Sequence, residues 1–465
     1  MITYIKINGF KSFYNFEMEF SPFTVVAGAN ASGKSNLFDA LMLLSRLAET
    51  DNLKKAFSEQ RGEFIELFTQ YGNDAYASEM SFEVEMLVNK NVKDGWGNEA
   101  VLKYTRLKYG LRIKRFTNLS GIEDLAVTYE ELVNLKPGKD KWIGLLSTKN
   151  IENWRPRVKT GKRGIPYITT AMENGIPTVL VPQDGKTGNK RRFPLNHATR
   201  TVLSSFDTID FPHVFAAKEE MRSWRFLQLN PEDLRKPTNK RNGEDVITSS
   251  GKNLAGALHR IKQEDSYTLI EVSRKLQQFL PHFTEVHVVD DKENKQFLIK
   301  LKDNNQKEYS SRVLSEGTLR ILALCILEYD DKHTGLLCFE EPENGIHPFR
   351  MKSMVQLLKD LSIDFCEIDE PLRQIIVNTH SPAVIGNLFN LRNDKNVGIW
   401  YSQMRNIVSD IEGKRLIINA TKMLPVVNDD MQLSFEFSEN ERKLTLSTVK
   451  DYLQITDFED TIKSI

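Results

Sequence analysis

The first part of the chain alternates apolar and polar positions in a pattern that predicts two strands followed by a helix. An alternating segment runs from Ile2 to Phe20, and the short β-branched run Phe23–Ala27 comes after it. A glycine-rich loop follows, and Asn36–Leu47 then carries apolar residues at helical spacing. The pattern therefore predicts a buried strand, a loop and a helix in direct succession.

A second patterned block begins near Glu285 and alternates strands with helices. The predicted elements are strands at 285–290 and 296–302, a helix at 318–329, a strand at 335–339, a helix at 348–361 and a strand at 374–377. Because strands that alternate with helices form sheets with parallel members, this block predicts an α/β fold.

The residues between these two blocks differ from them in composition and in the spacing of apolar positions. Residues 78–132 show β patterns, 155–194 is rich in Gly, Pro, Lys and Arg, and 213–227 and 254–279 have helical spacing. No heptad or internal repeat is sustained, which argues against a coiled-coil arm. The expected division is a discontinuous core with a mixed or parallel sheet at 1–90 and 285–420, an α+β insertion at 91–284 and a C-terminal extension at 421–465.

The composition narrows the class of protein. The 465 residues carry 63 Lys+Arg and 63 Asp+Glu, so bulk charge gives no general affinity for nucleic acid. The three cysteines, Cys325, Cys338 and Cys366, have no C-x-x-C spacing, which argues against a disulfide framework or a structural zinc site. The N-terminus lacks the order of a secretion signal, and the apolar run Ile321–Leu327 is far shorter than a membrane span. We expect a cytoplasmic protein with no membrane partner.

Basic clusters in the expected insertion are candidates for contact with DNA or RNA. Aromatic residues are interleaved with them, a texture typical of grooves that hold a phosphate backbone, although such charge runs are usually solvated loops. Their members are Arg155, Arg157, Lys159, Lys162 and Arg163; Lys186, Lys190, Arg191 and Arg192; and Arg235, Lys236, Lys240 and Arg241.

The loop Gly28–Ser35 matches the pattern G-x-x-x-x-G-K-[ST] at every fixed position, between the predicted strand and helix. Its glycines would let backbone N–H groups surround phosphate oxygens, and the helix N-terminus would add partial positive charge. Lys34 would neutralise the β- and γ-phosphates, and the Ser35 hydroxyl would ligate Mg²⁺. The alternative is a glycine-rich turn before an ordinary helix, which does not account for the full match.

Two adjacent carboxylates, Glu340 and Glu341, end the apolar strand predicted at 335–339. A carboxylate at a strand end can hold Mg²⁺, directly or through water, and the next one can orient or deprotonate an attacking water. Alone, such a pair is more often a solvated strand end. Behind a phosphate loop, it indicates a metal ligand at Glu340 and a catalytic residue at Glu341. Asp is the usual residue at the metal position, so Glu340 is a departure.

Taken together, these motifs resemble those of the ABC-type ATPase branch that includes RecF, the SMC proteins and the overcoming-lysogenization-defect (OLD) family. The matching segments, in family order, are 9–13 (GFKSF), 28–35 (GANASGKS), 315–317 (SEG), 340–348 (EEPENGIHP) and 379–382 (THSP). The resemblance covers roughly residues 1–90 and 285–400.

The resemblance implies roles that spacing alone leaves open. Ser315 is by itself an ordinary candidate N-cap. Within this family it matches the signature-loop serine, which contacts the γ-phosphate of a nucleotide held by the opposite subunit. The resemblance also implies that His380 senses the γ-phosphate and that Glu343–His347 pass signals across a dimer. The implied nucleotide contacts are Gly28, Asn30, Gly33, Lys34, Ser35, Asn36, Ser315 and Gly317, and the implied metal ligands are Ser35, Glu340 and Gln70, with Gln60 as the alternative to Gln70.

The implied function is a slow Mg²⁺-dependent ATPase that forms a homodimer or a higher homo-oligomer around ATP. OLD nucleases carry a Toprim nuclease domain after the ATPase half, whereas residues 381–465 contain no clear strand-end pair of acidic residues. We therefore expect a sensor or regulatory subunit of a bacterial anti-phage system, acting on a separately encoded nuclease or toxin. Two alternatives stay open: a RecF-like ATPase that loads on DNA, and a scaffold that holds ATP to cage an effector.

Overall fold

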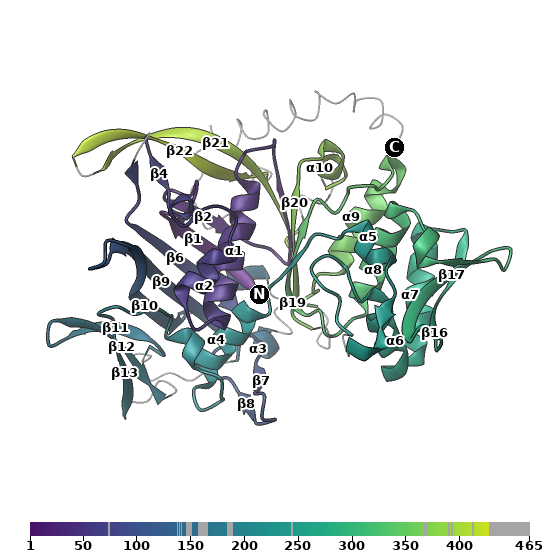
Figure 1. Ribbon diagram of the computed structural model, residues 1–465, viewed down its shortest axis with the longest axis horizontal. Helices are drawn as coiled ribbons and strands as arrows, with labels where there is room; N and C mark the ends of the chain where they lie inside the picture. The colour runs from purple at the N-terminus through teal and green to yellow at the C-terminus, as the bar shows by residue number, and fades with distance from the viewer. Residues whose placement is uncertain are drawn as a thin grey trace.

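Two large sheets, with helices between and beside them, make up the computed structural model (Figure 1). It describes residues 1–426 except 73–74, 137, 139, 141, 146–150, 157–165, 184–188, 243–244, 367–370, 389–390, 392–393 and 412. Most of the expected C-terminal extension, from 427 on, lies outside the described residues. So do five members of the basic clusters: Arg157, Lys159, Lys162, Arg163 and Lys186.

A six-stranded mixed sheet runs through the middle of the molecule, in the order β14-β19-β20-β3-β21-β22. The first five strands are parallel, and β22 is antiparallel to β21. The strands are β3 (Phe23–Ala27), β14 (Arg225–Leu227), β19 (Gly335–Glu340), β20 (Arg373–Thr379), β21 (Val397–Ile411) and β22 (Lys414–Pro425). Every residue of β3 is buried, because cores cover both faces of the sheet.

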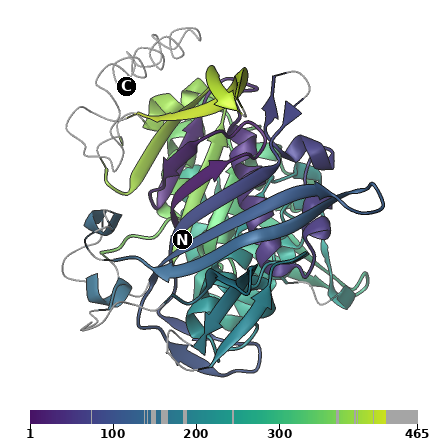
Figure 2. The same ribbon diagram turned by 90° about the vertical axis from the view of Figure 1, so that its left-hand side faces the viewer.

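A five-stranded antiparallel sheet, in the order β10-β9-β6-β1-β2, faces the viewer in Figure 2. Its strands are β1 (Ile2–Asn8), β2 (Phe16–Glu19), β6 (Glu79–Leu87), β9 (Arg106–Thr117) and β10 (Glu123–Asn134). Two helices, α1 (Lys34–Glu49) and α4 (Pro212–Arg222), share one core with both large sheets. Leu41 of α1, Val84 of β6, Ala217 of α4 and Ile376 of β20 all belong to this core.

A second core covers the opposite face of the six-stranded sheet. Val25 of β3, Leu322 and Leu337 belong to it, whereas the adjacent Val26 belongs to the first core. Its helices are α6 (Leu254–Glu264), α7 (Ser266–Phe279), α8 (Glu316–Glu328), α9 (Met351–Asp360) and α10 (Pro382–Leu388). A four-stranded sheet packs on α6 and α7 and consists of β15 (Thr238–Asn239), β16 (Phe283–Asp291), β17 (Gln296–Asp303) and β18 (Glu308–Ser310).

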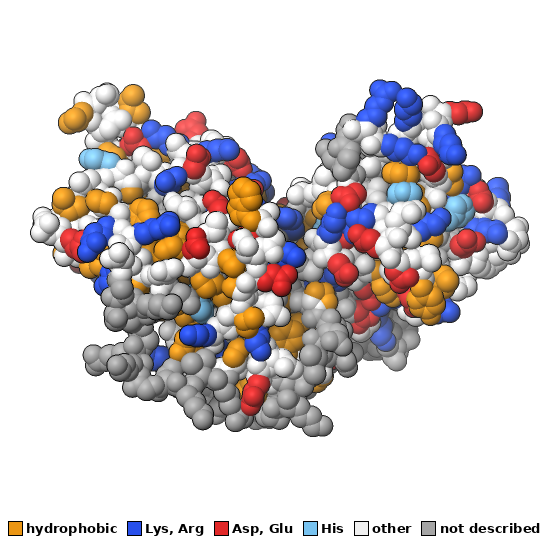
Figure 3. Space-filling view, turned by 90° about the horizontal axis from the view of Figure 1, so that it is seen from below, with side chains coloured by type: hydrophobic (Ala, Val, Ile, Leu, Met, Phe, Trp, Pro, Cys, Tyr) orange, Lys and Arg blue, Asp and Glu red, His pale blue; other side chains and the backbone are white. Residues whose placement is uncertain are grey.

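Smaller elements surround this framework. They are β4 (Gln70–Tyr71), β5 (Ala75–Tyr76), β7 (Asn91–Lys93), β8 (Glu99–Val101), β11 (Thr169–Glu173), β12 (Ile176–Pro182), β13 (Lys190–Pro194), α2 (Leu53–Ser58), α3 (Ile151–Trp154) and α5 (Pro231–Arg235). Seen from below, the surface is notched between the two halves of the molecule (Figure 3). Within the described part of the chain, no helix is long and apolar enough to cross a membrane.

The predicted α/β class is confirmed, and so are the strands and helices expected in the block from 285 to 377. The N-terminal alternating segment is a hairpin, β1 and β2, and not one strand. The reason is a tight turn in which Lys11 and Asn15 adopt left-handed φ values of 45° and 47°. Apolar residues recur through that turn, at Phe10, Phe13 and Phe16, so the sequence does not mark where the two strands end.

The two helical predictions in the middle of the chain are corrected. The helix expected at 213–227 ends at Arg222, and 225–227 forms β14, because these residues complete the sheet beside β19. The helix expected at 254–279 is two helices, α6 and α7, that meet at Asp265. The Asp265 side chain accepts a hydrogen bond from the backbone N–H of Tyr267 and so caps α7.

The sheets do not follow the expected boundaries at residues 90 and 285. Strands β9 and β10 pair into the same sheet as β1, and β14 pairs with β19. Strand pairing thus crosses both expected boundaries, and the division into a core and an insertion stays a prediction.

Candidate nucleotide-binding site

The parallel strands bring the predicted site residues to one edge of the six-stranded sheet. Ala27 at the end of β3 is paired with Thr379 of β20 and with Tyr401 of β21, and Glu340 is paired with Asn378. The loops that follow these strands therefore meet. This edge, at the carboxyl ends of parallel strands, is where open α/β sheets bind ligands.

The phosphate loop is held between helix α1 and the β21–β22 hairpin. Gly33 is the N-cap of α1 with φ of 88°, and a Cβ there would lie 1.8 Å from Thr421 Oγ1. A Cβ on Gly28 would lie 2.4 Å from the carbonyl oxygen of Ser402. Only glycine fits at either position, so the motif's two glycines are required by the hairpin as well as by the turn.

A cavity of about 230 Å³ opens over this loop. It is lined by Asn30, Ala31, Ser32, Gly33, Lys34, Ser35, Asn36, Glu341, Asn378 and Met404. Lys34 Nζ donates to the carbonyl oxygens of Gly28 and Ala29, each at 2.8 Å. Burial lowers the pKa of Lys34, against the opposing charges of three nearby glutamates. The cavity thus combines a helix N-terminus with a partly desolvated cation.

Ser35 and Glu340 meet at one side of the loop. Ser35 Oγ donates to Glu340 Oε1 at 3.1 Å, and Asn378 Nδ2 lies 3.4 Å from the same hydroxyl. A hydroxyl and a carboxylate oxygen are ligands of the type that Mg²⁺ prefers, and this ion commonly takes few protein ligands beside phosphate and water. Among the described residues, no group of three or more His, Cys, Asp or Glu side chains is arranged so that it could hold a metal ion. The pair fits Mg²⁺ shared with a phosphate.

Glu341 and His380 are in direct contact. His380 Nδ1 lies 2.6 Å from Glu341 Oε1, and Asn344 Nδ2 donates to Glu341 Oε2 at 3.0 Å. Burial opposes ionisation of Glu341, but the hydrogen bonds from Asn344 and His380 outweigh it and lower its pKa. Since an ionised carboxylate only accepts, Nδ1 of His380 is the donor. Glu341 also has a left-handed φ of 47°, with its N–H donating to Asn378 O at 2.9 Å.

Ser315 and Gly317 lie away from this cavity in the same chain. Ser315 caps α8: its Oγ accepts from Thr318 N at 3.3 Å and lies 2.9 Å from Thr318 Oγ1. A Cβ on Gly317 would lie 2.7 Å from the Gly345 carbonyl oxygen, so the two loops are in close contact. Neither Ser315 nor Gly317 lines the phosphate cavity.

The two candidate glutamines do not line the phosphate cavity either. Gln70 lies on the exposed strand β4, which is held by Tyr76 and by the β22 hairpin strand, and it borders a separate hollow. Gln60 is buried, and its amide atoms have no hydrogen-bond partner among the described residues. The structure places Gln70 at this hollow and not at the phosphate cavity that Ser35 lines.

The separate hollow encloses about 700 Å³ beside the phosphate cavity. Its lining is Lys11, Ser12, Arg61, Gly62, Glu66, Phe68, Gln70, Gly72, Tyr76, Ile417 and Asn419. Asn36, which lines the phosphate cavity, donates through Nδ2 to Ser12 Oγ of this hollow at 2.7 Å, so the two cavities are neighbours. Buried Asp39 of α1 holds both Lys11, at 2.7 Å, and Arg61, at 2.8 Å. Two cations therefore line this hollow.

Sequence reasoning missed the contribution of the hairpin. Ser402 Oγ donates to the Ser32 carbonyl oxygen at 2.7 Å, Met404 lines the cavity and Thr421 packs on Gly33. The available signal was the apolar start of β21, which predicts a strand but not its pairing with β3.

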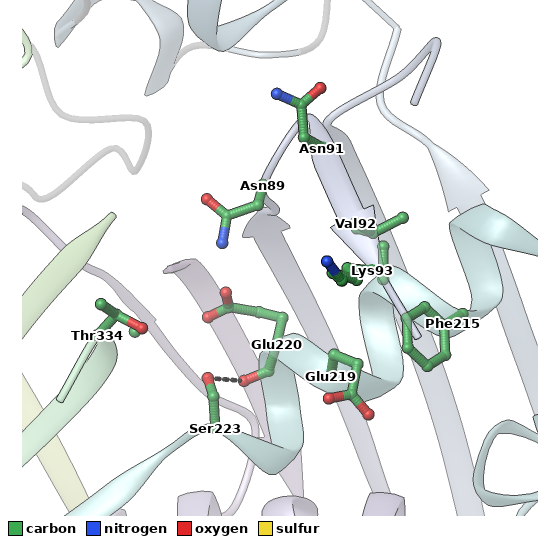
Figure 4. Close-up of a pocket in the computed structure, with 11 residues that line it drawn as sticks. Asn89, Asn91, Val92, Lys93, Phe215, Glu219, Glu220, Ser223 and Thr334 are labelled. Atoms are coloured by element: carbon green, nitrogen blue, oxygen red, sulfur yellow. Dashed lines mark hydrogen bonds between the residues drawn. The ribbon is translucent and has the colours of Figure 1, made fainter. Parts of the chain in front are cut away.

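A further cavity, of about 220 Å³, lies beside β7, α4 and the start of β19 (Figure 4). In Figure 4 the side chains of Asn89 and Glu220 turn toward one another, and Ser223 Oγ donates to the Glu220 carbonyl oxygen at 2.7 Å. Since Gly335 begins β19, this cavity lies at the sheet edge opposite the phosphate loop.

The fold and the phosphate loop define a P-loop ATPase. The chain belongs to the family described as "AAA domain, putative AbiEii toxin, Type IV TA system", whose family model matches residues 23–386. No curated protein matches the chain.

Solved structures of SMC heads are similar to the chain at low identity. One is an SMC head bound to the C-winged helix domain of ScpA, with 14% identity, 91% of this chain and 98% of that chain covered, and a TM-score of 0.48. Another is an SMC head domain from Thermotoga maritima, with 12% identity, 91% and 98% covered, and a TM-score of 0.38. A third, with an extended coiled coil and derived from Pyrococcus furiosus, is bound to the C-terminal domain of ScpA, with 13% identity, 97% and 99% covered, and a TM-score of 0.42.

Proposed function

We propose that the chain binds Mg-ATP at the phosphate loop, hydrolyses it with Glu341 as general base and does so as a homodimer. One observation carries this proposal. Lys34, Ser35 and Glu341 line a single cavity, and the side chains that support them, Glu340 and His380, are within hydrogen-bond distance of Ser35 and Glu341.

Each of these side chains has a distinct task in the proposed reaction. Lys34 and the helix N-terminus bind phosphate oxygens, and Ser35 with Glu340 would hold Mg²⁺, which supplies positive charge to the phosphates when bound. The lowered pKa of Glu341 keeps it ionised at neutral pH, the form that accepts a proton from water. His380 orients the Glu341 carboxylate through Nδ1.

The adjoining hollow gives room for the nucleoside part of ATP. The phosphate cavity, at about 230 Å³, is too small for a whole nucleotide, and the hollow of about 700 Å³ lies next to it, on the other side of the Asn36–Ser12 hydrogen bond. Lys11 and Arg61 line this hollow and share the single carboxylate of Asp39, so one positive charge in excess would face the bound nucleotide.

A second copy of the chain would complete the site. Ser315 and Gly317 open α8, a 13-residue helix whose N-terminus can bind a phosphate, yet they do not line the cavity of their own chain. A two-fold arrangement would place these residues of each subunit over the phosphate loop of the other.

The proposed biological role is control of a separately encoded effector in a bacterial defence system. The family description, which names a toxin of a type IV toxin–antitoxin system, supports a role in systems of this kind. Described basic residues favour this role over nucleic-acid binding, because acidic or aromatic neighbours hold several of them. Arg192 pairs with Glu173, Lys236 pairs with Asp233, and Arg191 stacks over Phe206 and Phe211.

Glu341→Gln tests the proposed reaction. Phosphate release and mass by light scattering would be measured with Mg-ATP for the unaltered chain and the variant. We expect the variant to bind ATP, to lose hydrolysis by about 100-fold or more, and to accumulate as a dimer or larger assembly. Glu308→Gln is the matched control, because that exposed carboxylate pairs with Lys300 on β17. Normal hydrolysis by Glu341→Gln would refute the assignment of the base.

A further inference from the structure

Glu343 is a buried carboxyl that the proposed reaction does not use. It is 6% exposed and lies two positions after Glu341. Its Oε1 accepts a hydrogen bond from the Thr379 hydroxyl, whereas Oε2 is buried and has no hydrogen-bond partner among the described residues. A buried acceptor without a partner costs stability, so this carboxyl needs an explanation other than folding.

The Thr379 hydroxyl connects Glu343 to the turn that carries His380. Thr379 ends β20, and its Oγ1 accepts from Ser381 N at 3.0 Å while it donates to Glu343. His380, between these two residues, contacts Glu341 Oε1 through Nδ1 at 2.6 Å. Two carboxyls of one loop therefore hold the same turn, one through Thr379 and one through His380.

The backbone of the loop after β19 makes this double contact possible. Glu341 has φ of 47°, which reverses the chain and lets its N–H donate to Asn378 O at 2.9 Å. Ile346 N then donates to Glu343 O at 3.0 Å and closes the loop. Both carboxyl side chains are thereby directed at the end of β20.

The environment of Glu343 shifts its pKa in a direction that suits a supporting role. Burial raises the pKa of Glu343, and the Thr379 hydrogen bond and the His380 charge oppose this only in part. The raised pKa means that Glu343 gives up its proton less readily than an exposed glutamate does, which limits negative charge at a site that has to accept a triphosphate.

We propose that Glu343 is a positioning residue for ATP hydrolysis: through the Thr379 hydroxyl it fixes the turn in which His380 holds Glu341 ready for the attacking water. The inference rests on the proposed function. Glu343 acts through Thr379 and His380 and does not touch the nucleotide, so its loss affects the chemical step and not ATP binding.

Steady-state hydrolysis by variants of the full chain tests the proposal. Glu343→Ala and Thr379→Val should each lower kcat by about 10- to 100-fold and leave KM for Mg-ATP unchanged. The double variant should be no slower than either single variant, because both changes break the same link. Glu343→Gln and Thr379→Ser should retain most activity, since the side-chain oxygen that accepts and the hydroxyl that donates both remain.

Glu130→Ala is the matched control for removal of a buried carboxyl. Glu130 is fully buried on β10 and accepts from the Tyr109 hydroxyl, but it is outside the phosphate cavity. The Glu130→Ala variant should have a lower Tm and an unchanged kcat. If Glu343→Ala likewise lowers only Tm, or if it raises KM at constant kcat, Glu343 is not a positioning residue.

An activity-independent readout separates this inference from the proposed function. In protein labelled with [¹³C]histidine, the His380 ring signal, assigned with His380→Gln, should shift in Glu343→Ala and Thr379→Val but not in Glu343→Gln. If the unaltered chain does not hydrolyse ATP, the proposed reaction fails while this signal still reports the link. If the chain hydrolyses ATP but the His380 signal is the same in Glu343→Ala, the inference alone fails.

Discussion

Glu130 on β10 fastens a loop to the five-stranded sheet by a fully buried carboxyl. Its Oε2 accepts from Val202 N at 2.6 Å, and its Oε1 accepts from Leu203 N at 2.8 Å and from the Tyr109 hydroxyl at 3.0 Å. Burial raises the pKa of Glu130 to about 7, although all three hydrogen bonds favour the charged form. The folded chain therefore holds this proton more tightly than the unfolded chain does.

Glu130 should make the free energy of unfolding depend on pH. Because the folded-state pKa is raised, its contribution is fully present below the ordinary value of 4.5 and is lost as the pH rises through about 7. A shift of this size corresponds to about 3 kcal/mol. Urea unfolding between about pH 5 and 8 should show the unaltered chain losing stability relative to Glu130→Gln, which has no proton to lose. A difference that does not change with pH would contradict this.

At the scale of single residues, predictability depended on motifs. Lys34, Ser35 and Glu341 line one cavity, and the sequence brings them together because each lies at a fixed spacing from a strand end; their roles there stay a prediction. The Glu343–Thr379 hydrogen bond was not predicted, since it joins residues 36 positions apart whose contact depends on the pairing of β19 with β20.

At the scale of elements, the β21–β22 hairpin contacts two other segments. It packs against the phosphate loop near the sheet and against the turn between β1 and β2 farther along. Ser402 near the sheet holds the Ser32 carbonyl, and Thr421 N donates to Ser12 O at 2.8 Å. Farther along, the Ser409 and Tyr14 hydroxyls are 2.6 Å apart. The conformation of the loop therefore depends on an element that follows all the predicted motifs in the chain.

Ser402→Ala should weaken nucleotide binding. The variant removes the donor to the Ser32 carbonyl oxygen, a hydrogen bond worth about 1 kcal/mol net, which corresponds to about fivefold weaker Mg-ATP binding. Isothermal titration calorimetry on the Glu341→Gln background measures this without turnover. Ser409→Ala loses a hydrogen bond on the same hairpin and should bind as tightly as the parent. Equal affinities for the two variants would mean that the hairpin does not support the loop.

Elements with a strong period were predictable, and those defined by distant partners were not. The apolar spacing of α8 and the buried run of β3 identified both from sequence. The three residues of β14 are too few to show a period, and only their parallel pairing with β19 makes them a strand. The same limit explains why the expected boundaries of the insertion divide three sheets, the five-, six- and four-stranded ones.

At the scale of the whole molecule, the candidate nucleotide contacts form two separate sets. One surrounds Lys34 at the phosphate cavity, and the other is Ser315 with Gly317 at the start of α8. The α/β class and the shared sheet edge followed from the sequence because alternating strands and helices dictate them. Neither the α/β class nor the shared sheet edge predicts how two chains meet, since no periodic signal in the sequence describes an interface.

Mixing two inactive variants tests most directly whether two chains build each ATP site. Lys34→Ala removes the phosphate-binding cation, and Ser315→Asp keeps the N-cap of α8 but places a negative charge against the partner's triphosphate. Ser315→Asn, a neutral N-cap, is the control and should remain active. Each variant alone should be inactive, and an equal mixture should regain about a quarter of the unaltered rate, because half of the dimers would be mixed with one intact site each. If Ser315→Asp hydrolyses ATP as fast as Ser315→Asn, or if the mixture regains nothing, the two-chain site is wrong.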